Sequence, residues 1–349
     1  MALGDMCPSA SIGAPGALKR AFRLAALAAL ALGFAPSRAA AQATSISTCQ
    51  TAPLTASVTL GQSIAAPAGW AGPCLTIGAD NVTVNLATFT IDVSAEGDVG
   101  VAINAGAFNN TTIDNGTITT NYTTSAADSS AAIEATGGSI LNVSGLTIEN
   151  LPGGSACAQV NNSDQNQGTG ISINAVAGGT IGPDVVSCYQ TGINVQNSSV
   201  PRQGAGSISG NTLNWNTYYM GGATTETYSG GLVLSNSSGW TVSNNQIEFT
   251  GSVSPSYDCT PTGTVLTCAF GLQIINGSSD NSITGNTVSS NFVGGIMTGS
   301  DTAKNSIMSN TAINNGIYDL YEVGQGHGNN FRSNTCFSVG GSLTLRACQ

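Results

Sequence analysis

Basic residues are scarce in this chain, which has 8 Lys and Arg against 18 Asp and Glu and a net charge of −10. Beyond residue 43 only Arg202, Lys304, Arg332 and Arg346 remain against 17 acids, a balance of about −13. Proteins that bind nucleic acid use Lys and Arg to displace counterions. The sequence therefore excludes a nucleic-acid partner, and the acidic balance argues against a strongly anionic polymer such as pectate.

Histidine is almost absent as well, since His327 is the only one, and no CxxC pair occurs. Without such ligands the sequence predicts no metal site and no cofactor. The Gly-His-Gly around His327 is similar to a short polygalacturonase motif, but the NTD, paired DD and RIK segments of that family are missing. The GGxGxD repeat of calcium β-rolls is missing too. We therefore interpret His327 as a turn residue.

Long apolar runs are also lacking, apart from the short run Leu24–Phe34. It follows the basic residues Lys19, Arg20 and Arg23 and precedes small residues up to Ala43. This order is typical of a secretory signal peptide, and the run is too short to span a bilayer, which needs roughly 20 residues. We predict that residues 1–43 are removed on export and that the mature protein is secreted or periplasmic, without a transmembrane segment.

Eight cysteines remain after that boundary, an even number in an exported chain, which indicates a set of disulfides. Eight cysteines allow 105 pairings in principle. Proximity in the sequence favours the pairs Cys49–Cys74, Cys157–Cys188, Cys259–Cys268 and Cys336–Cys348.

Two short units recur along the mature chain. A glycine followed by an aliphatic residue occurs at residues 170–171, 192–193, 231–232, 271–272 and 295–296, with Asp319-Leu320 as a variant. A second unit, aliphatic-x-x-Asn-x-aliphatic, places asparagines at Asn211, Asn245, Asn286, Asn310 and Asn334. Repeats of this length are the signature of a solenoid, in which each unit buries its apolar face only against its neighbours.

Alternation such as Gly-Leu-Val-Leu-Ser at 231–235 predicts short strands with one buried face. Asparagine tolerates the left-handed backbone of a corner, and its amide can bond to the same residue in the next coil. We therefore interpret the five repeated asparagines as a structural column rather than as ligands for a substrate.

The segment CLTIGADNVTVNLATFTID at 74–92 and the copies of SITGNTV resemble the right-handed parallel β-helix proteins of the pectate-lyase-like superfamily. The resemblance implies an all-β right-handed parallel β-helix over 74–349. Because a solenoid exposes apolar ends unless they are capped, we expect residues 44–73 to form an N-terminal cap and the last residues a C-terminal cap. This superfamily includes lyases, glycosidases, epimerases, carbohydrate-binding proteins and adhesins, so the resemblance implies a fold and not one activity.

The chain exceeds the basic coil length at residues 121–130, 150–169, 214–230 and 250–269. These insertions follow the second aliphatic strand, so stacking in register predicts that they project on one face, where binding residues concentrate. The exposed chemistry of the third and fourth insertions gives the predicted substrate-binding residues, namely Trp215, Tyr218, Tyr219, Glu226, Tyr228, Tyr257 and Asp258. Aromatic rings beside acids and amides suit sugars, although such rings also pack loops onto a barrel wall.

Catalysis is only weakly indicated. Glu226 and Asp258 are the candidate carboxylate pair of a glycosidase, and Glu248 is a further candidate. The outward positions of the first strand are predicted to be Ser172, Asn194, Val233, Gln273, Met297 and Tyr321. That row contains no ionisable group except a tyrosine, which weighs against an enzyme.

The sequence therefore favours a secreted β-helix that binds an extracellular polysaccharide or surface polymer through its stacked loops. Two alternatives stay open. One is a glycosidase or polysaccharide lyase acting on a neutral or weakly charged glycan, and the other is a structural or adhesive surface solenoid.

Overall fold

In the computed structural model, residues 44–123, 130–138, 140–151, 167–201, 205–216, 230–250, 270–324 and 327–349 are described. They belong to one compact unit that runs from Ala43 to Gln349. The predicted signal peptide lies outside the described residues and stays a prediction. Within the described residues no helix is long and apolar enough to cross a membrane.

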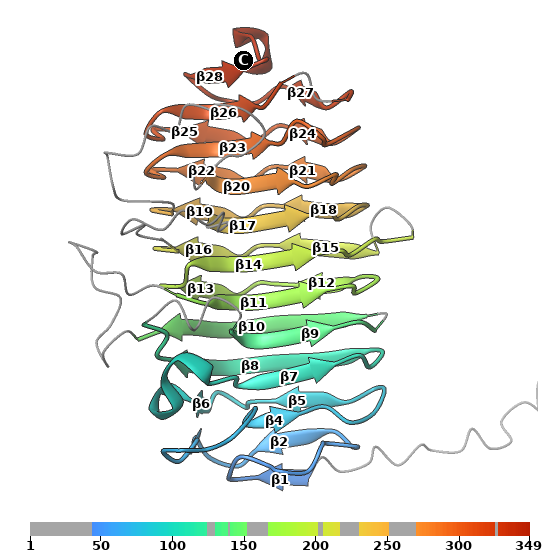
Figure 1. Ribbon diagram of the computed structural model, residues 1–349, viewed down its shortest axis with the longest axis vertical. Helices are drawn as coiled ribbons and strands as arrows, with labels where there is room; N and C mark the ends of the chain where they lie inside the picture. Colours follow the sequence, from blue (N-terminus) through green and yellow to red (C-terminus); the bar gives the residue numbers. More distant parts are fainter. Residues whose placement is uncertain are drawn as a thin grey trace, which may run out of the picture. The chain divides into compact units, whose positions relative to one another are not determined.

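The chain winds through three columns of short strands that stack coil upon coil (Figure 1). Within each column, strands of neighbouring coils pair in parallel. One column forms the ten-stranded sheet, whose strands pair in the order from β28 to β4. Its members are β4 (Leu75–Thr76), β7 (Ile103–Gly106), β9 (Ala131–Thr136), β11 (Thr169–Asn174), β14 (Thr191–Gln196), β17 (Gly230–Ser235), β20 (Phe270–Ile275), β23 (Gly294–Thr298), β26 (Tyr318–Glu322) and β28 (Val339–Gly341).

The other two columns form the 18-stranded sheet, and we call them its first and second arms. The first arm contains β1 (Thr44–Ile46), β2 (Val58–Leu60), β5 (Thr83–Asn85), β12 (Gly179–Ile181), β15 (Gly206–Ser209), β18 (Trp240–Ser243), β21 (Ser282–Thr284), β24 (Ser306–Met308) and β27 (Asn330–Arg332). The second arm contains β3 (Ile64–Ala65), β6 (Thr90–Asp92), β13 (Val185–Ser187), β16 (Thr212–Asn214), β19 (Gln246–Glu248), β22 (Thr287–Ser289) and β25 (Thr311–Ile313). The long strands β8 (Thr111–Thr120) and β10 (Leu141–Asn150) pass through both arms.

This arrangement confirms the predicted right-handed parallel β-helix. A parallel crossover between strands of one sheet is right-handed in nearly all proteins. Each coil contributes at most one short strand to each column, and such strands are stable only when they pair with the coils on either side. The repeat in the sequence and the stack in space are therefore the same feature.

The predicted asparagine column is confirmed at the bend between the two arms. The Nδ2 group of each asparagine donates to Oδ1 of the next over 2.9–3.1 Å, from Asn211 through Asn245, Asn286 and Asn310 to Asn334. The backbone N–H of each residue donates to the same Oδ1, for example that of Asn245 to Asn286 at 3.0 Å. All five side chains are at most 1% exposed. The ladder thus satisfies buried amides that would otherwise be costly.

Two further ladders occupy the other corners. Asn281, Asn305 and Asn329 are joined through Nδ2 to Oδ1 bonds of 3.0 Å at the entrance to the first arm. At the exit of the second arm, Asn291 donates to Asn315 over 2.9 Å. Amide ladders therefore hold all three corners of the C-terminal coils in register.

The recurring glycines stand where the chain turns into the ten-stranded sheet. A Cβ atom on Gly231 would lie 2.4 Å from Cγ2 of Ile247, and one on Gly271 would lie 2.7 Å from Nδ2 of Asn291. Real Cβ atoms do not approach other heavy atoms so closely. Glycine is required here by the close approach of the second arm.

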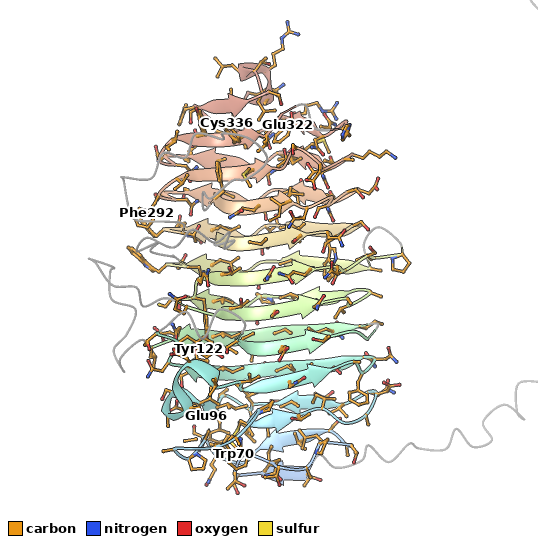
Figure 2. The ribbon with its side chains drawn as sticks, viewed as in Figure 1. Trp70, Glu96, Tyr122, Phe292, Glu322 and Cys336 are labelled. Atoms are coloured by element: carbon orange, nitrogen blue, oxygen red, sulfur yellow. A yellow bond between two sulfur atoms is a disulfide. The ribbon has the colours of Figure 1, made fainter. Side chains whose placement is uncertain are left out.

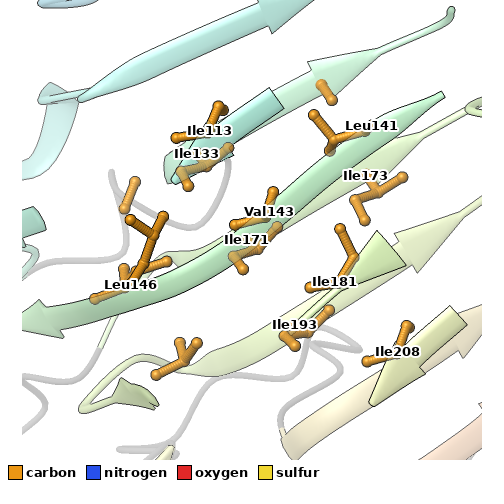
Figure 3. Packing of buried hydrophobic residues seen from close by; sticks show 14 of the residues in the cluster. Ile113, Ile133, Leu141, Val143, Leu146, Ile171, Ile173, Ile181, Ile193 and Ile208 are labelled. Atoms are coloured by element: carbon orange, nitrogen blue, oxygen red, sulfur yellow. The ribbon is translucent and has the colours of Figure 1, made fainter. Parts of the chain in front are cut away.

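The core is a continuous column of aliphatic side chains that stack on one another from coil to coil (Figure 3). Ile113, Val143, Ile181 and Ile208 occupy successive coils of the first arm and are completely buried. Ile133, Ile171 and Ile193 do the same in the ten-stranded sheet. Removing these side chains from water is the main source of stability in such a stack.

Both ends of the stack are fastened by predicted disulfides, because Cys49 is bonded to Cys74 and Cys336 to Cys348. Cys188 is disulfide-bonded too, but its predicted partner Cys157 and the pair Cys259–Cys268 lie outside the described residues. The predicted cap at 44–73 already carries strands β1 to β3, which pair with the coils that follow.

Candidate functional site

The outer face of the ten-stranded sheet carries one row of side chains that pair from strand to strand, with a register shift in β7 after Asn104. The row runs from strand to strand through β7, β9, β11, β14, β17, β20, β23 and β26. Its residues are Asn104, Glu134, Ser172, Asn194, Val233, Gln273, Met297 and Tyr321. The predicted outward row from Ser172 to Tyr321 is thus found as one aligned column.

The row changes character along the stack. Asn104, Glu134, Ser172 and Asn194 are polar and partly exposed. From Val233 onward the row is at most 5% exposed and joins an outer apolar cluster. Within that cluster the rings of Phe270 and Tyr318 lie 6.0 and 5.0 Å from that of Tyr321. Only the half nearer the N-terminus therefore offers polar groups, and we call Asn104, Glu134, Ser172 and Asn194 the polar row.

Glu134 corrects the sequence interpretation, in which the row held no ionisable group except a tyrosine. The row continues beyond Ser172 to the carboxylate of Glu134 on β9, its direct neighbour in register. The pattern of Gly-aliphatic steps does not include this strand because β9 reads Ala131-Ala132-Ile133-Glu134, with alanine in place of glycine. The step Ala-Ile-x, which also occurs at 102–104, is the signal that could have found it.

A second acid stands beside this face on η1 (Ser94–Val99), the 3-10 helix between β6 and β7. Figure 2 shows Glu96 and Tyr122 on the same side of the stack, next to that helical turn. Both carboxylate oxygens of Glu96 are buried and have no hydrogen-bond partner among the described residues. Removal from water disfavours the charged form, and this burial raises the pKa of Glu96 to about 7.

Tyr122, which interacts electrostatically with both acids, is fully buried. Its hydroxyl donates to the carbonyl oxygen of Gly100. Burial raises the pKa of the Tyr122 phenol well above its ordinary value, and the charges of Tyr189, Glu96 and Glu134 add to this effect. Glu96 and Glu134 therefore both lie within electrostatic range of one buried phenol.

Two more polar groups complete this end of the face. Asp98 on η1 accepts hydrogen bonds from the backbone N–H of Thr123 at 2.5 Å and from its hydroxyl at 3.4 Å. The amide oxygen of Asn194 is buried and has no hydrogen-bond partner among the described residues. Buried polar groups in native proteins normally have partners, so the exceptions mark places where a ligand could supply them.

The corner that leads into this sheet carries an aromatic pair. Trp215 stacks on Phe249 of the next coil, with ring centroids 4.6 Å apart and planes inclined by 9°. Both residues have positive φ angles, 56° and 53°, and both are partly exposed. Trp215 is thus held at the predicted corner, directly ahead of a long connection.

Glu248, the further catalytic candidate, is not part of this face. It lies on the outer side of β19 in the second arm, where its carboxylate accepts a hydrogen bond of 2.9 Å from Oγ of Ser289. The predicted residues Tyr218, Tyr219, Glu226, Tyr228, Tyr257 and Asp258 lie outside the described residues and stay predictions.

His327 is exposed and forms an isolated bridge with Ala303 of the preceding coil, in a turn. Across the described part of the chain, no group of three or more His, Cys, Asp or Glu side chains could hold a metal ion.

The long connections all run between the same two columns of strands. They leave after β8, β10, β16 and β19 and return at β9, β11, β17 and β20, so each leads from the second-arm column into the ten-stranded sheet. This corner, or the ten-stranded sheet that follows it, therefore carries all three features described above: the polar row, η1 and the Trp215–Phe249 pair.

These features define a class, a right-handed parallel β-helix whose outer sheet face carries an aligned polar row. No protein-family model matches the sequence, and no curated protein matches it. Among solved structures it is similar to tailspike protein 2 of Escherichia coli O157:H7 bacteriophage CAB120, with 13% identity, a TM-score of 0.45, and coverage of 83% of this chain and 38% of the tailspike. The chain thus spans well under half of that protein.

Two mannuronan C-5 epimerase modules of Azotobacter vinelandii are also similar. The AlgE4 A-module has 13% identity and a TM-score of 0.41, with 82% of this chain and 86% of the module covered. The AlgE6 A-module has 14% identity and a TM-score of 0.35, with 83% and 91% covered.

Proposed function

We propose that this protein binds an extended polysaccharide along the outer face of its ten-stranded sheet. The observation that carries the proposal is that the Asn194 amide oxygen on this face and the Glu96 carboxylate on η1 are buried and have no hydrogen-bond partner among the described residues. Sugar hydroxyls donate and accept hydrogen bonds, so a glycan could supply partners for these two groups.

The geometry of the polar row suits a linear polymer. Its side chains repeat at the spacing of adjacent parallel strands, about 4.8 Å, in a line across successive coils. The row contains no cation, and Glu134 gives it negative charge. A neutral or weakly charged glycan therefore fits better than a polyanion. The Trp215–Phe249 pair offers an apolar surface on which a pyranose ring could stack.

The disulfides Cys49–Cys74 and Cys336–Cys348 support a place outside the cytoplasm, because such bonds persist in oxidising compartments. Together with the predicted signal peptide, they support the proposal that the protein meets its glycan in the periplasm or outside the cell.

A glycan array tests this proposal. The wild type, Glu134→Gln, Asn194→Ala and Trp215→Ala are compared, with Thr147→Ala as the control because Thr147 is exposed on β10 in the second arm, away from the face. We expect the wild type and the control to bind the same glycans, and Glu134→Gln, Asn194→Ala and Trp215→Ala to bind at least about tenfold more weakly. If no glycan bound to any of the five proteins, the wild type included, the result would support a structural or adhesive solenoid instead.

A second candidate function is cleavage of such a glycan. It is favoured by the pKa of Glu96, about 7, because a carboxyl group that keeps its proton near neutral pH can act as a general acid while a second carboxylate, Glu134, acts as base or nucleophile. Glycosidases use such pairs of carboxyl groups on either side of the scissile bond.

Release of reducing ends and of unsaturated products from a polysaccharide panel tests this second candidate. Activity should fall as the pH rises through about 7, where Glu96 loses its proton. It should also disappear in Glu96→Gln. If cleavage survives in Glu96→Gln but is lost in Glu226→Gln or Asp258→Asn, the predicted insertion residues and not Glu96 carry the chemistry.

A further inference from the structure

A second regular surface lies on the outer side of the first arm, away from the face described above. In Figure 1 the strands β12, β15, β18, β21 and β24 follow one another in one column. Their first outward positions, continued from β10, are in register and read Asn142, Thr180, Ser207, Thr241, Ser282 and Ser306. The second outward positions, from β15 to β21, are Ser209, Ser243 and Thr284.

These two rows are made almost entirely of hydroxyl groups and contain no charge. All six hydroxyl side chains on β15, β18 and β21 are partly exposed. None of the six makes a side-chain hydrogen bond to another described residue. Their hydrogen-bonding capacity is therefore directed to the solvent.

The spacing of this lattice is fixed by the β-helix. Neighbouring parallel strands lie about 4.8 Å apart, and alternate residues along one strand lie about 6.6 Å apart. Because the coils stack in register, the hydroxyls form a two-dimensional grid whose repeats are comparable with those of water oxygens on the low-index planes of ice.

The chemistry of the grid separates ice from other partners. It has no cation to neutralise the phosphates of a nucleic acid, and it has no aromatic ring on which a sugar could stack. The amide ladder at the neighbouring bend, from Asn211 to Asn310, holds the strands rigidly in register. A rigid, uncharged hydroxyl grid is suited to a partner that is itself a lattice of hydrogen-bonding oxygens.

We propose that the outer face of β15, β18 and β21 binds ice, with Thr241 at the centre of the contact. The hydroxyls would order water in the lattice positions of an ice plane. The surface is separate from the polar row of the ten-stranded sheet, so the proposal does not depend on glycan binding.

Uptake of the full chain into a slowly growing ice front, together with thermal hysteresis, tests this proposal. Thr241→Lys and Ser243→Lys place a cation within the grid. Thr287→Lys is the matched control, because Thr287 is an exposed outward threonine on β22 of the second arm in the same coil as β21. Arg332 already stands outward at the end of the first arm, so a long cation is compatible with such a position.

We expect the wild type and Thr287→Lys to enter ice and to show thermal hysteresis, and Thr241→Lys and Ser243→Lys to lose both with an unchanged melting temperature. The proposal is overturned if the wild type enters ice no more than serum albumin does, or if grid and control variants behave alike. Sedimentation of the wild type with crystalline cellulose but not uptake into ice would also overturn it, in favour of a solid polysaccharide.

Discussion

At the scale of single residues, Asp184 occupies the place that asparagine holds in later coils. Its Oδ1 accepts the backbone N–H of Leu146 at 2.9 Å, and its own N–H donates to Oδ1 of Asn211 at 3.0 Å, as in the ladder. Its Oδ2 is buried and has no partner among the described residues, whereas an amide nitrogen there could donate to Asn211. Burial raises the pKa of Asp184 to about 6.

This environment predicts a pH-dependent stability. The carboxyl group binds its proton more tightly in the folded chain than at its ordinary value of 3.8, so its contribution is fully present below pH 3.8 and is lost as the pH rises through about 6. Asp184→Asn should remove this dependence and raise the free energy of unfolding at pH 7 by about 1–3 kcal/mol. Denaturant unfolding at pH 4 to 8 measures both effects.

The control is Asp280→Asn, in an exposed turn, which should leave the pH profile of the wild type unchanged. If Asp184→Asn is as pH-dependent as the wild type, or less stable at pH 7, the buried carboxylate of Asp184 does not destabilise the folded chain as we infer.

At the scale of elements, acidic side chains in the last coils accept the hydrogen bonds of the final asparagine in two of the ladders. Oδ1 of Asp319 accepts both the backbone and the side-chain N–H of Asn315, and its Oδ2 accepts the backbone N–H groups of Phe337 and Ser338. Glu322 similarly accepts from Asn329 and from Ser342. A solenoid needs such end groups because its terminal coil has a neighbour on one side only.

Asp319→Ala should therefore loosen the C-terminal coils selectively. Loss of an acceptor that serves four N–H groups leaves donors unsatisfied, at about 1–3 kcal/mol for each that stays buried. Hydrogen exchange should quicken across β26 and β28 and stay unchanged in β9 to β14. Asp301→Ala, in an exposed turn of the same region, is the control, and uniform acceleration along the whole stack would contradict a local capping role.

How far the elements could be predicted depended on how strictly they repeat. The Asn-containing unit of 24 residues between Asn286, Asn310 and Asn334 identified the bend between the arms, because a buried amide there must meet its equivalent in the next coil. The parallel column Asn281, Asn305 and Asn329 was missed, although each directly precedes a first-arm strand. Glu134 was missed because alanine replaces the diagnostic glycine in its coil.

The candidate site was less predictable for a physical reason. The register of the stacked coils determines which side chains are neighbours, so the outward row could be predicted once its position on one strand was known. The pKa of Glu96 is raised by burial on η1, a helical turn outside the repeat, so the periodicity of the sequence does not predict it. Among the predicted insertion residues, Trp215 lies within the described part of the chain, at a coil corner next to strands of the repeat.

At the scale of the whole molecule, the same alignment stabilises the chain and displays its surfaces. The asparagine ladder crosses five coils and maintains the register of the hydroxyl grid, whereas most of the polar row lies in the coils that precede the ladder. A break in the ladder should therefore reduce both stability and any function that depends on aligned rows.

Unfolding of Asn245→Ala tests that claim most directly. Nδ2 of Asn245 donates to the Ile208 carbonyl and to Asn286, and its Oδ1 accepts two bonds from Asn211, whereas its exposed neighbour Gln246 points outward. Asn245→Ala should lower the free energy of unfolding by about 3 kcal/mol or more, and Gln246→Ala should stay within about 0.5 kcal/mol of the wild type. Equal effects of the two substitutions would contradict a ladder that holds the coils in register.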